Sequence, residues 1–164
     1  MTQTAQITGD QLTNALHALG VKFILGGRTR VEDLHTQPAR LIAALAESDE
    51  SRLRLSLIPL FLEHPEFSAH VQAVASLLNP TARITLQCYY SAAVWLGQVH
   101  CKPAISLPDF FSSQLDLHPT DDPEENLCAL AERHSELTGT RVNWLGTYQH
   151  AAHVWQKSLE VDRG

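Results

Sequence analysis

Apolar residues recur every three or four positions along most of this 164-residue chain, and the segments start and stop at recognisable helix caps. Thr8 and Gln11 form a capping box, Asn79 precedes Pro80, and Gly139 follows a periodic segment. Such spacing places apolar side chains on one helix face. The sequence therefore predicts an all-α fold. The expected helices span about 9–19, 38–47, 51–63, 67–78, 80–96, 123–137 and 144–159.

The segment 53–62 is apolar nearly all round, which predicts a central, buried helix that Pro59 kinks. The expected core comprises Leu53, Leu57, Ile58, Phe61, Leu86 and Trp95. Residues 1–164 are interpreted as one helical domain with an irregular arm at about 100–120, which carries three prolines.

Two arrangements of these helices are open. Ala39–Leu45, followed by Asp49 and Arg54, resembles one helical hairpin of a HEAT repeat, and the resemblance covers about 38–97. Arg52–Leu57 and Arg83–Cys88 echo each other within it. The resemblance implies a short HEAT-like helical stack, and the other arrangement is an ordinary compact multi-helix bundle.

Residues 21–25 are β-prone and are closed by two glycines, so we expect at most one short strand, near the N-terminus. A single strand needs a partner for its backbone groups. Val21, Phe23 and Leu25 would point to one side of it. We therefore expect these three residues to contact a protein partner or a second copy of the chain.

Charge and cysteine content exclude several classes. The net charge is −6, with acids concentrated in 109–136 and no basic face, so no nucleic-acid partner is expected. No apolar run suits a bilayer span, and no signal peptide is visible, so no membrane association is expected. Three cysteines without CxxC spacing indicate packed, reduced thiols and a cytoplasmic location. No motif calls for a cofactor.

Arg30 and His35 have the R-x4-H spacing and so resemble the catalytic motif of HEPN-type ribonucleases. That resemblance implies a cation on the scissile phosphate and a histidine that moves a proton. His150 and His153 are three apart on one helix, and a third metal ligand would have to come from His134 or Cys128. We expect packed or polar helix histidines there, and no metal site.

Leu16–Gly27 resembles the opening of a nucleotidyltransferase fold, but Arg28 follows the glycines and no paired aspartates lie on a strand. That activity is therefore not expected. Leu137–His150 and Arg52–Leu62 are similar to uncharacterised bacterial helical proteins encoded beside minimal nucleotidyltransferases. This resemblance implies a partner protein of toxin–antitoxin or defence type. The sequence thus predicts a non-catalytic interaction or accessory protein, with a HEPN-like ribonuclease using Arg30 and His35 as the alternative.

Overall fold

The computed structural model describes residues 7–19, 36–100 and 107–163, with side chains as far as Lys157. About three quarters of the described residues are helical, and no strand occurs among them, which confirms the all-α prediction of a compact bundle. The predicted strand at 21–25 lies outside the described residues. Within the described ranges, no helix combines the length and the apolar character that crossing a membrane requires.

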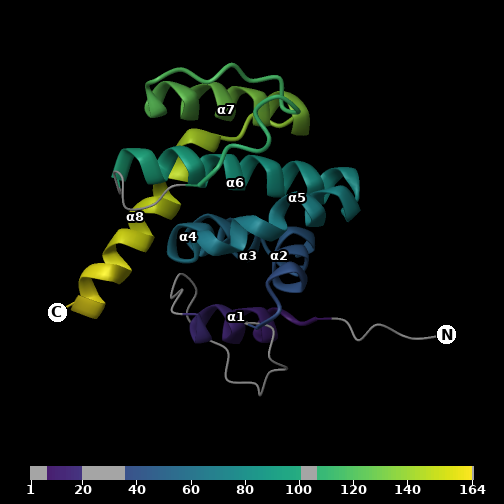
Figure 1. Cartoon of the computed structure of the whole chain (residues 1–164), viewed down its shortest axis with the longest axis vertical. Helices are drawn as coiled ribbons and strands as arrows, with labels where there is room; N and C mark the ends of the chain where they lie inside the picture. The colour runs from purple at the N-terminus through teal and green to yellow at the C-terminus, as the bar shows by residue number, and fades with distance from the viewer. Residues whose placement is uncertain (1–6, 20–35, 101–106, 164) are drawn as a thin grey trace.

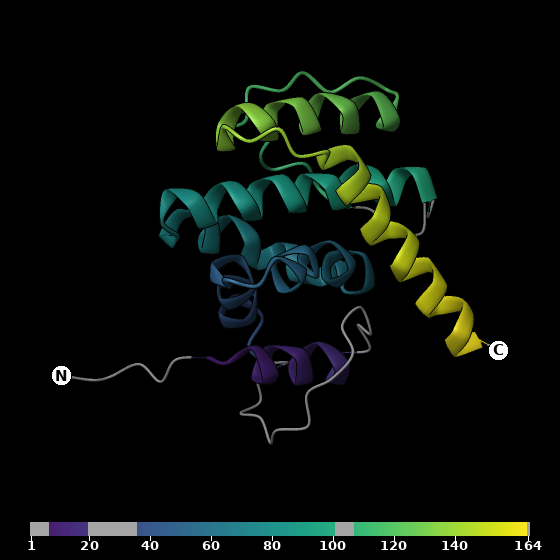
Figure 2. The same cartoon turned by 180° about the vertical axis from the view of Figure 1, so that it is seen from behind.

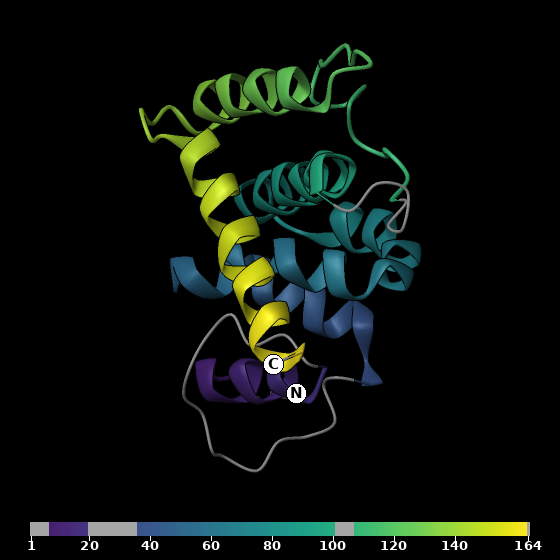
Figure 3. The same ribbon diagram turned by 90° about the vertical axis from the view of Figure 1, so that its left-hand side faces the viewer.

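Figure 1 shows the helices in layers, with α6 in the middle, α7 on one side of it, and α2 to α5 on the other. Helix α1 packs outermost, against α2 and α3, and α8 runs obliquely from α7 past α6 to α4 (Figures 2 and 3). The helices are α1 (Gly9–Ala18), α2 (Pro38–Glu47), α3 (Ser51–Leu55), α4 (Leu57–Glu63), the 3-10 turn η2 (Pro65–Phe67), α5 (Ser68–Leu77), α6 (Pro80–His100), α7 (Pro123–Thr138) and α8 (Trp144–Arg163).

The helix caps read from the sequence are confirmed. Thr8 and Gln11 exchange two hydrogen bonds, of 2.8 and 3.2 Å, at the start of α1. The Asn79 side chain accepts from the backbone N–H of Ala82 at 2.9 Å and so caps α6. Gly139 ends α7 with a φ of 68°, the left-handed conformation that glycine adopts without strain. These ends are set by local contacts, which is why the sequence predicts them well.

Around Pro59 the structure differs from the single kinked helix expected. The chain forms two helices, α3 and α4, which are separated by a turn at Ser56. Proline has no N–H to donate to the carbonyl four residues earlier, and its ring crowds that carbonyl. The second helix begins at Leu57, which puts Pro59 in its first turn, where a missing N–H leaves no helical bond unmade.

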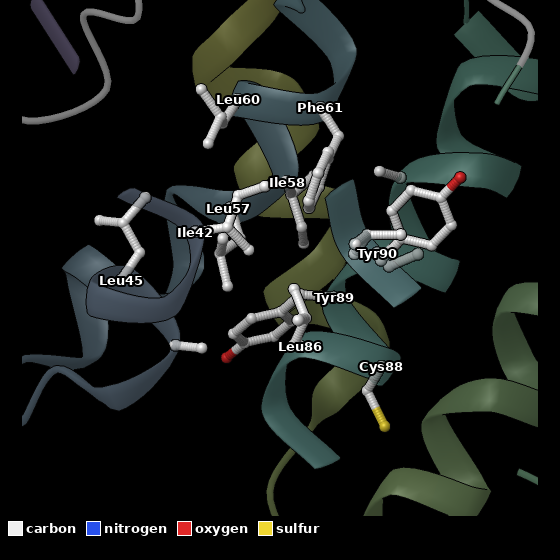
Figure 4. Packing of buried hydrophobic residues seen from close by; sticks show 14 of the residues in the cluster. Ile42, Leu45, Leu57, Ile58, Leu60, Phe61, Leu86, Cys88, Tyr89 and Tyr90 are labelled. Atoms are coloured by element: carbon white, nitrogen blue, oxygen red, sulfur yellow. The ribbon is translucent and has the colours of Figure 1, made fainter. Parts of the chain in front are cut away.

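The core lies where α2, α4 and α6 meet. Figure 4 shows Ile42 of α2 beside Leu57 and Ile58 of α4, and the ring of Phe61 directed toward Tyr90 of α6. The Phe61 and Tyr90 rings pack edge to face with centroids 5.0 Å apart. All six residues predicted for the core are buried, with exposed fractions between 0% and 3%.

The segment after α6 has no helix between residues 107 and 122, and it packs on the bundle. Leu107, Phe111 and Leu115 are buried, and the Tyr90 hydroxyl donates to the Pro108 carbonyl at 2.6 Å. Arg133 of α7 donates to the Leu115 carbonyl at 2.8 Å. The described part of the predicted irregular arm is therefore attached to α6 and α7 by both apolar and polar contacts.

Four side chains join neighbouring helices through polar contacts: Arg54 and Arg83, and then Glu63 and His64 at the end of α4. Arg54 donates to the Ser48 carbonyl at 2.7 Å, at the end of α2. Arg83 donates to the carbonyls of Ala75 and Leu78 at 2.9 and 3.0 Å, at the end of α5.

The end of α4 makes two such contacts. Glu63 accepts a hydrogen bond from the indole of Trp155 in α8 at 2.8 Å. The adjacent His64 donates through Nε2 to the carbonyl of Leu19, immediately after α1. Two consecutive residues thus connect α4 to the first and the last described helices.

Candidate functional site

The residues first proposed for function lie outside the described ranges. This applies to Val21, Phe23 and Leu25 of the predicted interface, and to Arg30 and His35 of the ribonuclease-like motif. Their roles remain predictions.

The histidines considered as metal ligands do not meet. His150 and His153 are exposed on α8, whereas His134 of α7 is buried. No cluster of three His, Cys, Asp or Glu side chains that could hold a metal ion occurs among the residues the structure describes. Cys128 is exposed on α7, so the expectation of a packed thiol is wrong there; it holds for Cys88, which is buried.

An open groove lies between the start of α1, one face of α2 and the link from α2 to α3. Its volume is about 870 Å³, within the range of typical ligand sites. The lining residues are Ile7, Thr8, Gly9, Leu12, Arg40, Ala43, Ala44, Glu47, Ser48, Asp49 and Glu50.

Helix α2 forms this groove because it has two different faces. One face carries the buried residues Leu41, Ile42, Leu45 and Ala46, which pack into the core. The groove face carries Arg40, Ala43, Ala44 and Glu47, which share one side of the helix because they are three or four residues apart. The methyl groups of the two alanines, which are only partly buried, leave space that larger side chains would fill.

The electrostatics of the groove are acidic at one end. Glu47, Asp49 and Glu50 are exposed and lie where α2 gives way to α3, whereas Arg40 lines the groove one to two turns earlier. The Glu50 carboxylate lies against Gly9 at the start of α1, a favourable position for an anion because helix N-termini carry partial positive charge. Glu50 also pairs with Arg52 at 3.2 Å, but both side chains are well exposed, so water weakens this pair.

A second polar cluster is buried between α6, α7 and α8. The hydroxyl of Tyr148 lies 2.6 Å from Nδ1 of His134, and the His134 ring stacks on Trp144 with centroids 3.6 Å apart. Tyr89 of α6 approaches the rings of His134 and Tyr148 edge to face. The exposed fraction of His134 is 2%, so the ring has almost no access to solvent.

Burial determines the charge states in this cluster. It lowers the pKa of His134 to about 4, because the imidazolium would lose its hydration. Burial also raises the pKa of Tyr89 and of Cys88 to about 12, and it raises that of Tyr148. At neutral pH His134 is therefore uncharged, and Nδ1 and the Tyr148 hydroxyl share one hydrogen bond whose donor is set by the tautomer of the ring. The cluster is a buried contact between α6, α7 and α8 that combines ring stacking with one hydrogen bond.

Neither the groove nor the buried cluster around His134 was evident from the sequence. The groove face of α2 looks like an ordinary half-exposed helix side until the position of α1 is known. The pairing of His134 with Tyr148 depends on how α7 and α8 turn back on each other. A usable signal did exist, since His134 occupies a position one helical turn after the buried Leu130 and so falls on the apolar face.

No model of a protein family, no curated protein and no solved structure matches this chain.

Proposed function

We propose that this chain is a non-catalytic interaction or accessory protein, which binds a protein partner through the groove beside α1. In line with the resemblance to proteins encoded beside minimal nucleotidyltransferases, the setting we propose is a bacterial toxin–antitoxin or defence system. The predicted contacts of Val21, Phe23 and Leu25 with a protein partner or a second copy of the chain are a separate part of this proposal.

The observation that carries the proposal is the construction of the groove. Ala43 and Ala44 line it without filling it, and the half-buried Ile7 adds an apolar side chain just before α1. Polar and charged residues surround these apolar groups, as in protein interfaces with an apolar centre and a polar rim. By contrast, the buried acid–base group of the described residues, His134, is held by Tyr148 and Trp144 inside the core.

A neutral substitution on the groove floor tests the proposal. Ala44→Gln adds a long side chain without charge at a helical position, so it narrows the groove and leaves the core face of α2 intact. Ala73→Gln is the matched control, because Ala73 is an exposed alanine on α5, remote from the groove in sequence. The measurement is affinity purification of each tagged variant from its native cells, quantified by mass spectrometry.

We expect a protein that the wild type and Ala73→Gln retain and that Ala44→Gln loses, with unchanged circular dichroism. Equal recovery with all three proteins would contradict the groove as the interface. The same preparations are incubated with labelled RNA, which should stay intact. Cleavage that disappears in His35→Ala would replace the proposal by the ribonuclease alternative.

A further inference from the structure

The shape and charge of the groove indicate what kind of partner segment fits. Resting on the function proposed above, we propose that the groove binds a short amphipathic helix from a partner protein. That helix presents small or aliphatic side chains to α2 and carries Lys or Arg next to the acidic end of the groove.

The length of the contact with the partner helix follows from the groove face of α2. The lining residues of this helix run from Arg40 to Glu47, which corresponds to about two turns, or roughly 10 Å at 1.5 Å per residue. A partner helix lying along this face would therefore contact it over about two turns.

The small residues on the floor of the groove allow a partner helix to approach α2 closely. Ala43 and Ala44 have only a methyl group each, so these two groove residues hold little volume, whereas the space beside Gly9 is taken by the Glu50 carboxylate. Small residues let a second helix come near with its own apolar side chains filling the space, as ridges fill grooves in helix packing. Ile7, which is half-buried, adds apolar surface on the α1 side.

The charges in the groove determine which side chains the partner helix carries at the edges of its contact face. The groove lining carries three carboxylates, of Glu47, Asp49 and Glu50, and one guanidinium, of Arg40. Within the described part of the chain, neither Glu47 nor Asp49 forms an ion pair. An acidic rim attracts Lys and Arg and repels phosphate, which favours a basic protein segment over a nucleic acid.

The acidic helix α7 provides the necessary control. It also exposes carboxylates, at Glu124, Glu125 and Glu132, but it is absent from the groove lining. A basic segment that bound by charge alone would recognise both surfaces, whereas one that uses the groove would depend only on Glu47 and Asp49.

The probe is a fluorescein-labelled peptide of about 16 residues, with alanine and leucine on one helical face and lysine on the other. The control peptide has glutamate in place of every lysine. Fluorescence anisotropy measures the binding of each to the full chain and to two double variants. Glu47→Lys with Asp49→Lys reverses two charges at the groove, and Glu124→Lys with Glu132→Lys reverses two on α7.

We expect the lysine peptide to bind, the glutamate peptide not to bind, and the groove variant to lose about tenfold in affinity. The α7 variant should remain within about twofold of the wild type. Ala44→Gln should weaken the binding of the lysine peptide as well.

Equal losses in both double variants would overturn the proposal, because the attraction would then be general. Failure of the lysine peptide to bind would also overturn it. If Ala44→Gln still lost a cellular partner in that case, the proposed function would stand and only the chemistry of the bound segment would be wrong. A dimer in light scattering that Ala44→Gln dissociates would identify a second copy as the occupant and overturn the proposal too.

Discussion

Mild acid should destabilise this protein through His134. The folded state keeps the imidazole neutral, because burial lowers its pKa from 6.5 to about 4. The unfolded chain exposes the ring and binds a proton as the pH falls through 6.5. Unfolding thus takes up a proton in this window. Stability is fully present above pH 6.5 and is lost progressively as the pH falls toward 4.

The magnitude follows from the same two pKa values. Each pH unit between them corresponds to about 1.36 kcal/mol, so the interval from 6.5 to about 4 amounts to about 3 kcal/mol. That is a large share of the 5–15 kcal/mol typical of a folded domain. In the protonated ring both nitrogens are donors, so Tyr148 could then only accept a hydrogen bond from Nδ1.

The test compares His134→Gln with the wild type in urea unfolding at about pH 7 and about pH 4.5. Glutamine supplies an amide oxygen that can accept the Tyr148 hydroxyl, and it does not titrate. The variant is expected to be less stable at pH 7, because it loses the stack on Trp144, but to lose much less stability on acidification. The difference between the two pH-dependent losses isolates His134 from the carboxylates.

His150→Gln is the matched control, since His150 is exposed on α8, the helix that carries Tyr148. This variant should keep the acid sensitivity of the wild type. The reasoning would be refuted if His134→Gln retained the full loss of stability between the two pH values. It would equally be refuted if His150→Gln abolished that loss.

Two further substitutions test the packing of the helices. Leu57→Ala removes a fully buried side chain from the contact between α2 and α4, so unfolding in urea should show a loss of about 2–5 kcal/mol; an unchanged midpoint would contradict the core described here. Arg83→Met keeps the aliphatic stem but leaves two carbonyls at the end of α5 without their donor. The thermal unfolding free energy should then fall by about 1–3 kcal/mol, whereas Arg52→Met, at an exposed site, should stay within about 0.5 kcal/mol of the wild type.

The sequence was most informative where structure is decided locally. The Thr8 capping box, the Asn79 cap and Gly139 each act within a few residues, so the ends of α1, α6 and α7 could be predicted. The buried positions in α4 and α6 followed from helical periodicity for the same reason.

Features that depend on tertiary contacts could not be predicted. Arg54 and Arg83 fall within the repeated segments noticed in the sequence, but their shared role, donating to the end of the preceding helix, is visible only in the fold. Predicting the groove would have required knowing the position of α1 relative to Ala43 and Ala44. His134 was considered only as a third metal ligand, and its pairing with Tyr148 depends on how α7 packs against α8.

The end of α4 has a consequence for how this molecule opens. Glu63 is bonded to a residue 92 positions later in the chain, and His64 to one 45 positions earlier. Native proteins open in contiguous cooperative units, and hydrogen exchange reports the free energy of each. Because one helical turn holds both partners, fraying of that turn breaks both hydrogen bonds at once, while α1 keeps its packing on α2 and α3 and α8 keeps its packing on α6 and α7. Loss of this one turn should therefore raise amide exchange next to Leu19 and next to Trp155 together, although more than 130 residues separate the two positions.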